Sequence, residues 1–124
     1  MLLNNLYTIQ SLSETDNIIQ ATINLKSDHA IFNGHFPGQP VLPGVCMMEM
    51  VSEVLGVCLH GSYRISGGPL IKFLRMIDPR MNPLINLEIN YQTSSLSTSA
   101  NGKIFSGQDV FMKFHIILVQ EPEI

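Results

Sequence analysis

Two residues in the segment from Gly34 to Met50 are of the types that form an acid–base pair. His35 can exchange a proton near neutral pH, and Glu49 stands among apolar neighbours. An ionised carboxylate in apolar surroundings is costly, so it stays protonated or finds a strong partner. Together they could act as general base and general acid. Each alone also fits a plainer role, with His35 in a surface loop and Glu49 on a solvent-facing strip of helix.

Gly44 adds a possible third element, because it stands at the start of a predicted helix. Backbone N–H groups in a first helical turn have no intrahelical partner and lie at the positive end of the dipole. A glycine there would let a substrate oxygen approach, and the N–H could stabilise negative charge on a carbonyl oxygen. Gly44 could equally just ease entry into the helix. The segment between His35 and Gly44 is stiffened by its prolines, Pro37, Pro40 and Pro43.

The helix that would carry this chemistry is predicted to begin near Pro43 and to run to Leu59. It is apolar nearly all round, which predicts that it is largely enclosed. Residues 61–69 are expected to end it, and residues 27–41 to form an irregular connection. Strands are predicted over residues 6–12, 18–25, 70–77, 84–96 and 103–119, with a tight reversal at Asn101-Gly102. This order predicts a single α+β domain over residues 1–124, in which a curved, mainly antiparallel sheet wraps around one long central helix.

The composition favours an assembly of subunits. Charged residues make up 14% of the 124 residues, against roughly 25% in an average domain. No apolar run reaches the ~18 residues of a membrane span, so the surface not covered by charge is expected to be a subunit interface. The net charge of −3, with scattered basic residues, argues against a nucleic-acid partner.

The cysteines and histidines indicate the compartment and the cofactor class. Cys46 and Cys58 lie twelve residues apart on the predicted helix, about 18 Å, which is too far for a disulfide. Free thiols and the lack of a signal-peptide pattern predict a cytoplasmic protein. The four histidines show no ligand spacing and the cysteines form no CxxC, so no metal site is predicted.

The motif from His35 to Glu49 resembles a known family. His35-Phe36-Pro37-Gly38-x-Pro40, followed by Pro43-Gly44 and Glu49, is similar to the signature of the (3R)-3-hydroxyacyl-[acyl-carrier-protein] dehydratases, hotdog-fold enzymes of the FabZ and FabA type. The glutamate is typical of the FabZ branch. Lys72-Phe73-x-Arg75 and Pro79 resemble the strand and turn after the family's central helix. Two departures stand out: Glu53 where the family commonly has glutamine, and Arg80-Met81 where it commonly has Gly-Asp.

The resemblance implies a lyase of lipid metabolism, such as fatty acid biosynthesis, that needs no cofactor. It would dehydrate a 3-hydroxyacyl thioester on acyl carrier protein to the trans-2-enoyl thioester. His35 would remove the C2 proton, the Gly44 N–H would bind the carbonyl oxygen, and Glu49 would position or protonate the departing hydroxyl. An acyl tunnel would be lined by Phe36, Val45 and Met48, which fit a plain core equally well. The acidic carrier protein would dock on Lys72, Arg75 and Arg80, each equally plausible as a solvated surface charge.

In hotdog dimers the histidine and the acid of one site usually come from different subunits. The resemblance therefore implies a homodimer or a higher oligomer, including a trimer of dimers. Two other functions remain open: a non-catalytic, acyl-binding or accessory hotdog subunit, and a hotdog thioesterase. Loss of His35 or Glu49 would have favoured the accessory subunit, but both are present. Thioesterases generally place their acid elsewhere and lack the HFPGxP turn.

Overall fold

The computed structural model describes residues 1–33, Gly38 and residues 40–122. In these ranges the chain forms one long helix, α1 (Gly44–Leu59), and one short 3₁₀ helix, η1 (Ala30–Asn33). The same ranges contain six strands: β1 (Tyr7–Thr15), β2 (Ile18–Leu25), β3 (Tyr63–Phe73), β4 (Leu84–Thr93), β5 (Thr98–Ser106) and β6 (Asp109–Gln120).

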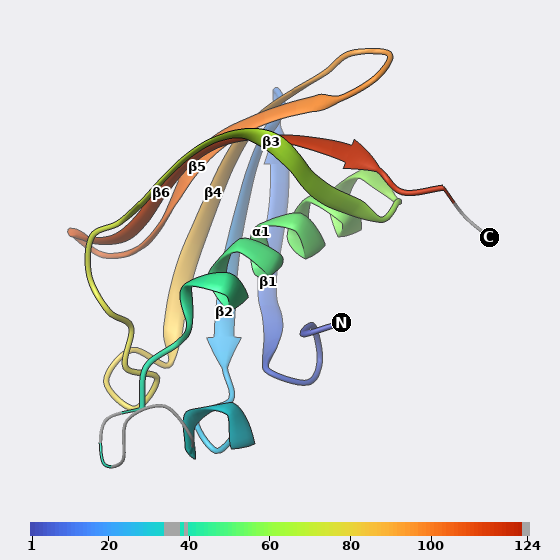
Figure 1. The fold of residues 1–124 in the computed structure, drawn as a ribbon. Coiled ribbons are helices and arrows are strands. Elements are labelled where there is room, and N and C mark those ends of the chain that lie inside the picture. Colours follow the sequence, from blue (N-terminus) through green and yellow to red (C-terminus); the bar gives the residue numbers. More distant parts are fainter. Residues whose placement is uncertain (34–37, 39, 123–124) are drawn as a thin grey trace.

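The strands form one sheet in the order β1-β2-β4-β5-β6-β3, and every neighbouring pair is antiparallel. Figure 1 shows the sheet curving over α1, which runs along its inner side. The predicted α+β architecture, a curved antiparallel sheet around one central helix, is confirmed.

The core lies between α1 and the inner face of the sheet. In β2 the predicted alternation is confirmed, because its buried residues are Ile19, Ala21, Ile23 and Leu25. On α1 the residues with no exposed surface are Met50, Val51, Val54 and Leu55. The helix is less enclosed than its composition predicts: Val45 in the first turn is 73% exposed. The start of α1 is therefore open in the single chain.

The predicted reversal at Asn101-Gly102 is wrong, since both residues lie inside β5. A Cβ at Gly102 would stand 1.8 Å from the carbonyl oxygen of Glu88 on β4. Glycine is needed there for the close approach of two strands rather than for a turn. The chain reverses instead at Gly107, whose φ is +57°, and between Ser94 and Ser97, where the Ser94 N–H donates to the Ser97 carbonyl oxygen at 2.8 Å.

The end of the helix region also differs from the prediction. Residues 61–69 were expected to end the helix and residues 70–77 to form the next strand, but β3 begins at Tyr63 and ends at Phe73. The pairing of β3 with β6 shifts register between Ile65 and Gly67 and again between Gly67 and Leu70. Glycine and proline are tolerated there because β3 is an edge strand of the sheet. The register shifts interrupt the regular pairing with β6 at these residues.

Candidate active site

The predicted site residues fall into several places. His35 and Phe36 lie outside the described residues. At the start of α1 lie Gly44, Val45 and Met48. Glu49 follows on the same helix, and the basic residues proposed for docking lie in β3 and in the loop after it: Lys72, Arg75 and Arg80.

The start of α1 is shaped by Pro43 and Gly44. Pro43 is the N-cap in an extended conformation and offers no capping side chain, while its carbonyl oxygen accepts from the N–H of Cys46 at 3.0 Å. A Cβ at Gly44 would lie 2.8 Å from Cζ of Phe73. Glycine is required here by space, because the Phe73 ring lies against the backbone of the first turn.

An open apolar groove of about 700 Å³ extends from this helix start. It brings together three predicted site residues, Gly44, Val45 and Met48, with three residues that were not predicted to line a tunnel: Phe73, Leu74 and Met76. Phe73 and Leu74 are about half exposed and Met76 is 74% exposed. A groove with such walls suits an alkyl chain or an apolar surface of another subunit. The only sequence signal for this wall was Phe73 within the Lys72-Phe73-x-Arg75 motif.

Glu49 does not face this groove. It lies five residues after Gly44, so the two are about 140° apart around the helix axis. Glu49 instead lines a smaller hollow of about 180 Å³ together with Ser52, Glu53 and Tyr63. Its side chain is exposed in the single chain. One chain therefore does not bring Gly44 and Glu49 into the same cavity.

Glu53, one helical turn after Glu49, is the carboxylate that is buried, at 7% exposed. Its Oε2 accepts a hydrogen bond from the N–H of Leu2 at 2.8 Å, and its Oε1 accepts from the N–H of Leu3 at 2.9 Å and from the hydroxyl of Tyr7 at 2.8 Å. Burial, and then this hydrogen bond, raise the pKa of the Tyr7 phenol. The sequence placed a second carboxyl beside Glu49 but gave no sign of these partners.

The pKa of Glu49 is raised above its ordinary value. The main cause is partial desolvation, followed by the negative charge of Glu53. The ammonium group of Met1 acts in the opposite direction, and Glu121 adds a small increase. Glu49 therefore holds its proton to a higher pH than a free glutamate does, as a general acid requires.

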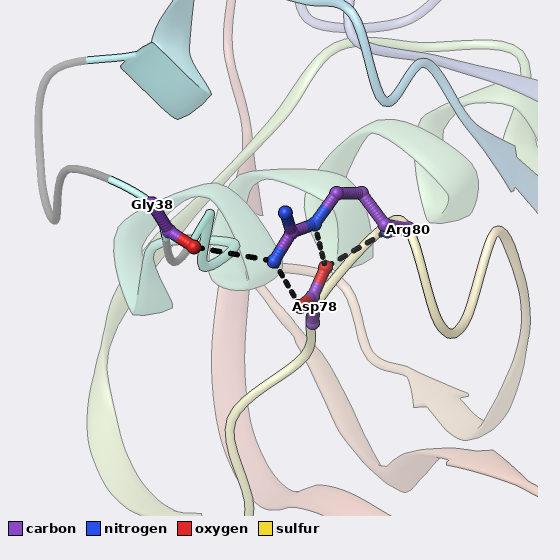
Figure 2. Close-up of polar contacts among 3 residues, drawn as sticks. All are labelled: Gly38, Asp78 and Arg80. Carbon is purple, nitrogen blue, oxygen red and sulfur yellow. Dashed lines mark hydrogen bonds and ion pairs between the residues drawn. The ribbon is translucent and has the colours of Figure 1, made fainter.

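Arg80 contacts Gly38, a residue of the motif. Figure 2 shows its guanidinium between the Asp78 carboxylate, at 3.1 Å from Nη2 to Oδ2, and the Gly38 carbonyl oxygen, at 3.4 Å from Nη2. The hydrogen bonds with Arg80 lower the pKa of Asp78. Gly38 has φ +82°, a conformation that favours glycine. The departure at Arg80 therefore links the loop after β3 to the segment that follows His35.

The three basic residues proposed for docking differ in their partners. Arg75 pairs with Asp109 at 3.3 Å and Arg80 pairs with Asp78. Lys72 takes part in neither of the two ion pairs found among residues 1–33, 38 and 40–122. Lys72 is thus the least neutralised of the three.

Within the described part of the chain, no group of three or more His, Cys, Asp or Glu side chains is arranged to hold a metal ion. Cys46 is buried and Cys58 is half-buried, and both are free thiols. No helix of the described residues combines the length and the apolarity that a membrane crossing requires.

The chain is similar in sequence to curated dehydratases. A FabZ 3-hydroxyacyl-[acyl-carrier-protein] dehydratase of Haemophilus influenzae is 31% identical over 78 residues, which are 60% of this chain and 53% of that protein. The chain thus spans about half the length of this curated relative.

Solved structures support the fold. The dehydratase heterocomplex ApeI:P of Xenorhabdus doucetiae superposes with a TM-score of 0.70 at 20% identity, covering 90% of this chain and 96% of that one. A thioesterase of Haemophilus influenzae superposes with a TM-score of 0.63 at 15% identity, covering 95% of this chain and 80% of that one. These likenesses confirm the predicted hotdog fold, and they show that the fold alone does not separate dehydratases from thioesterases.

The sequence family described as ApeI dehydratase, ApeI-like, matches residues 11–108 of the chain. That match covers most of the sheet and all of α1. The chain belongs to the ApeI-like dehydratase family.

Proposed function

We propose that this chain is a hydro-lyase that dehydrates a 3-hydroxyacyl thioester, carried on acyl carrier protein, to the trans-2-enoyl thioester. The observation that carries the proposal is the open apolar groove at the start of α1, where Gly44 leaves the first-turn backbone uncovered by a side chain of its own. An acyl chain fits the groove, and the thioester carbonyl would lie at the positive end of the helix. Family membership and the FabZ relatives support the same chemistry.

The reaction would divide between His35, Gly44 and Glu49. His35 takes the proton from C2, and the electron pair forms the C2–C3 double bond as the C3–O bond breaks. The Gly44 N–H stabilises the charge that builds on the thioester oxygen. Glu49 gives its proton to the departing hydroxyl, which leaves as water. Both groups return to their starting states when the proton on His35 passes back to Glu49, directly or through water.

The complete site would span two chains. Support comes from the separation of Gly44 and Glu49 into different hollows of the single chain, and from the exposed apolar residues around the groove, Val45, Phe73 and Met76. A second copy would cover part of this surface and supply the missing acid, as a homodimer or within a larger ring of dimers. Because the superposed ApeI:P structure is a heterocomplex, a related but non-identical subunit is the alternative partner.

Carrier docking is proposed for a row of three lysines that includes Lys72. Lys72 on β3 lies directly opposite Lys113 on β6, and Lys113 lies directly opposite Lys103 on β5. All three line a hollow of about 490 Å³ on the sheet, which Glu88 of β4 also lines, directly opposite Lys103. Like charges placed opposite each other destabilise a sheet, and an acidic partner would relieve that cost. Arg75 and Arg80 are assigned a smaller part because each already faces a carboxylate.

The test is turnover of 3-hydroxyacyl and trans-2-enoyl thioesters on carrier protein by wild type, His35→Ala and Glu49→Gln. Wild type should interconvert the two thioesters, and each variant should lose at least about 10²-fold. Mixing the two inactive variants should then restore about a quarter of the wild-type rate. Half of the dimers would be mixed, and each mixed dimer would have one of its two sites intact. Lack of recovery on mixing would refute the shared site.

The same assay separates the alternatives. Release of free thiol without a change in the acyl chain would indicate a thioesterase. Acyl binding without turnover at any chain length would indicate an accessory subunit, and turnover that appears only when a second hotdog protein is added would indicate a heterocomplex. The substrates of this reaction are intracellular thioesters, so the proposed site of action is the cytoplasm.

A further inference from the structure

Glu53 carries a second inference, because it departs from the glutamine common in the family and yet is buried. Its two carboxylate oxygens accept three hydrogen bonds, from the backbone of Leu2 and Leu3 and from Tyr7. Tyr7 has no exposed surface, so its hydroxyl has no access to bulk water. An ionised carboxylate is a pure acceptor, and three donors converge on it here. A glutamine would turn its NH₂ group towards at least one of these donors.

These contacts tie two distant parts of the chain together. Leu2 is 51 residues from Glu53 in sequence, and Tyr7 is 46 residues away. The N-terminal segment is thereby fastened onto α1, and Met1 becomes part of the wall of the hollow that Glu49 and Glu53 share. The Glu53 contacts therefore hold one side of the hollow beside Glu49 in place.

Glu53 is also placed to act on Glu49 directly. The two lie four residues apart on α1, a spacing that puts side chains on the same face one turn apart. The three donors hold the Glu53 carboxylate in one position, whereas the Glu49 side chain is exposed in the single chain.

We propose that Glu53 is a positioning residue for Glu49: its three hydrogen bonds fix one side of the Glu49 hollow and hold a carboxylate one helical turn away. The inference rests on the proposed function, in which Glu49 is the general acid. A fixed like charge favours the protonated form of its neighbour, so Glu53 would keep Glu49 loaded with the proton that it must deliver. The other groups that face Glu49 are the Met1 ammonium, which opposes this effect, and Glu121, which adds to it. Tyr7 and the Cys46 thiol also lie within its electrostatic reach.

The first test measures Glu49 itself, without any activity. The Glu49 side-chain carboxyl carbon is followed by NMR through a pH titration in wild type, Glu53→Gln and Tyr7→Phe. The pKa of Glu49 should fall in Glu53→Gln and stay near the wild-type value in Tyr7→Phe, which keeps the charge. Amide exchange at Leu2 and Leu3 should quicken in Glu53→Gln. The matched control is Glu14→Gln, which removes the charge from the hydrogen-bond partner of the Tyr91 hydroxyl elsewhere in the fold.

The second test measures dehydration against pH. In Glu53→Gln the alkaline limb of kcat should move to lower pH, with kcat there reduced about tenfold and KM changed less than about twofold. Glu14→Gln should leave the profile unaltered. An unmoved Glu49 titration in Glu53→Gln, or an equal shift in Glu14→Gln, overturns the inference. Absence of turnover in wild type would refute the proposed function, and the NMR titration would still decide whether Glu53 controls Glu49.

Discussion

Gly44→Ala tests whether the close contact between the Phe73 ring and the start of α1 is needed. The added Cβ would lie 2.8 Å from Cζ and 2.9 Å from Cε1 of Phe73. Ordinary carbon contacts are about 3.5–4.0 Å, so the ring must move by about 0.7–1.2 Å. Overpacking typically costs about 1–3 kcal/mol. Because Phe73 is 51% exposed and can swing outwards, we expect a loss near the lower end, about 1 kcal/mol.

The functional effect should exceed the effect on stability. The ring forms a wall of the groove beside the Gly44 N–H, and a misplacement of about 1 Å near reacting groups can cost up to 10²-fold in rate. We expect kcat/KM for dehydration to fall at least about tenfold, and most for long acyl chains, which need the whole groove. Unfolding by urea at one fixed protein concentration gives the stability, since subunit association depends on concentration.

Two further variants make the result decisive. Phe73→Leu lacks the ring atoms that collide, so it should restore most of the activity when added to Gly44→Ala. Gly67→Ala is the matched control, because a Cβ at Gly67 meets nothing within 4 Å. Full activity in Gly44→Ala, or no rescue by Phe73→Leu, would contradict the role given to this contact.

Three other predictions follow from single contacts. The pKa of Tyr7 in the folded chain is raised by burial and by Glu53, so the phenol ionises first in the unfolded chain. The free energy of unfolding therefore falls as the pH rises above the ordinary tyrosine pKa of 10.0. Urea titrations at several pH values should show a smaller fall in Tyr7→Phe. Met50→Ala removes a fully buried side chain of α1 and should cost about 2–5 kcal/mol in the same assay, with secondary structure retained by circular dichroism. The pKa of Glu49 is raised in the folded chain, so its ionised form destabilises the fold at neutral pH. At pH 7, Glu49→Gln should therefore unfold at a higher urea concentration than wild type. The difference should vanish in acid, below the ordinary glutamate pKa.

Local signals in the sequence were sufficient for the parts of the fold that depend on neighbours in the chain. The alternation in β2 follows directly from its apolar residues at every second position. The helix start follows from Pro43, whose missing N–H suits the beginning of a helix. Both predictions are confirmed because no distant segment competes with these preferences.

The wrong predictions concern glycines and prolines whose roles depend on the sheet. Asn101-Gly102 resembles a hairpin turn, yet Gly102 serves the approach of the β4 backbone at Glu88. Gly67, Gly68 and Pro69 resemble a break, yet they lie in an edge strand. Strand order decides both cases, and a single sequence does not contain it.

At the candidate site the sequence placed residues but not their partners. The spacing along α1 predicted that Glu53 would lie beside Glu49, because four residues make about one turn. It could not predict that Leu2, Leu3 and Tyr7 would close around the Glu53 carboxylate, because those contacts join segments 46–51 residues apart. The assignments of His35 and Glu49 as base and acid remain predictions.

The lysine row across β3, β6 and β5 implies two opposite responses to ionic strength. Dissolved salt weakens the repulsion among Lys72, Lys113 and Lys103, which favours the folded sheet. The same screening would weaken the proposed attraction between these lysines and an acidic carrier protein, and the two would then associate more slowly. Raising the salt concentration would thus increase the free energy of unfolding and, at the proposed docking site, slow association with the carrier protein.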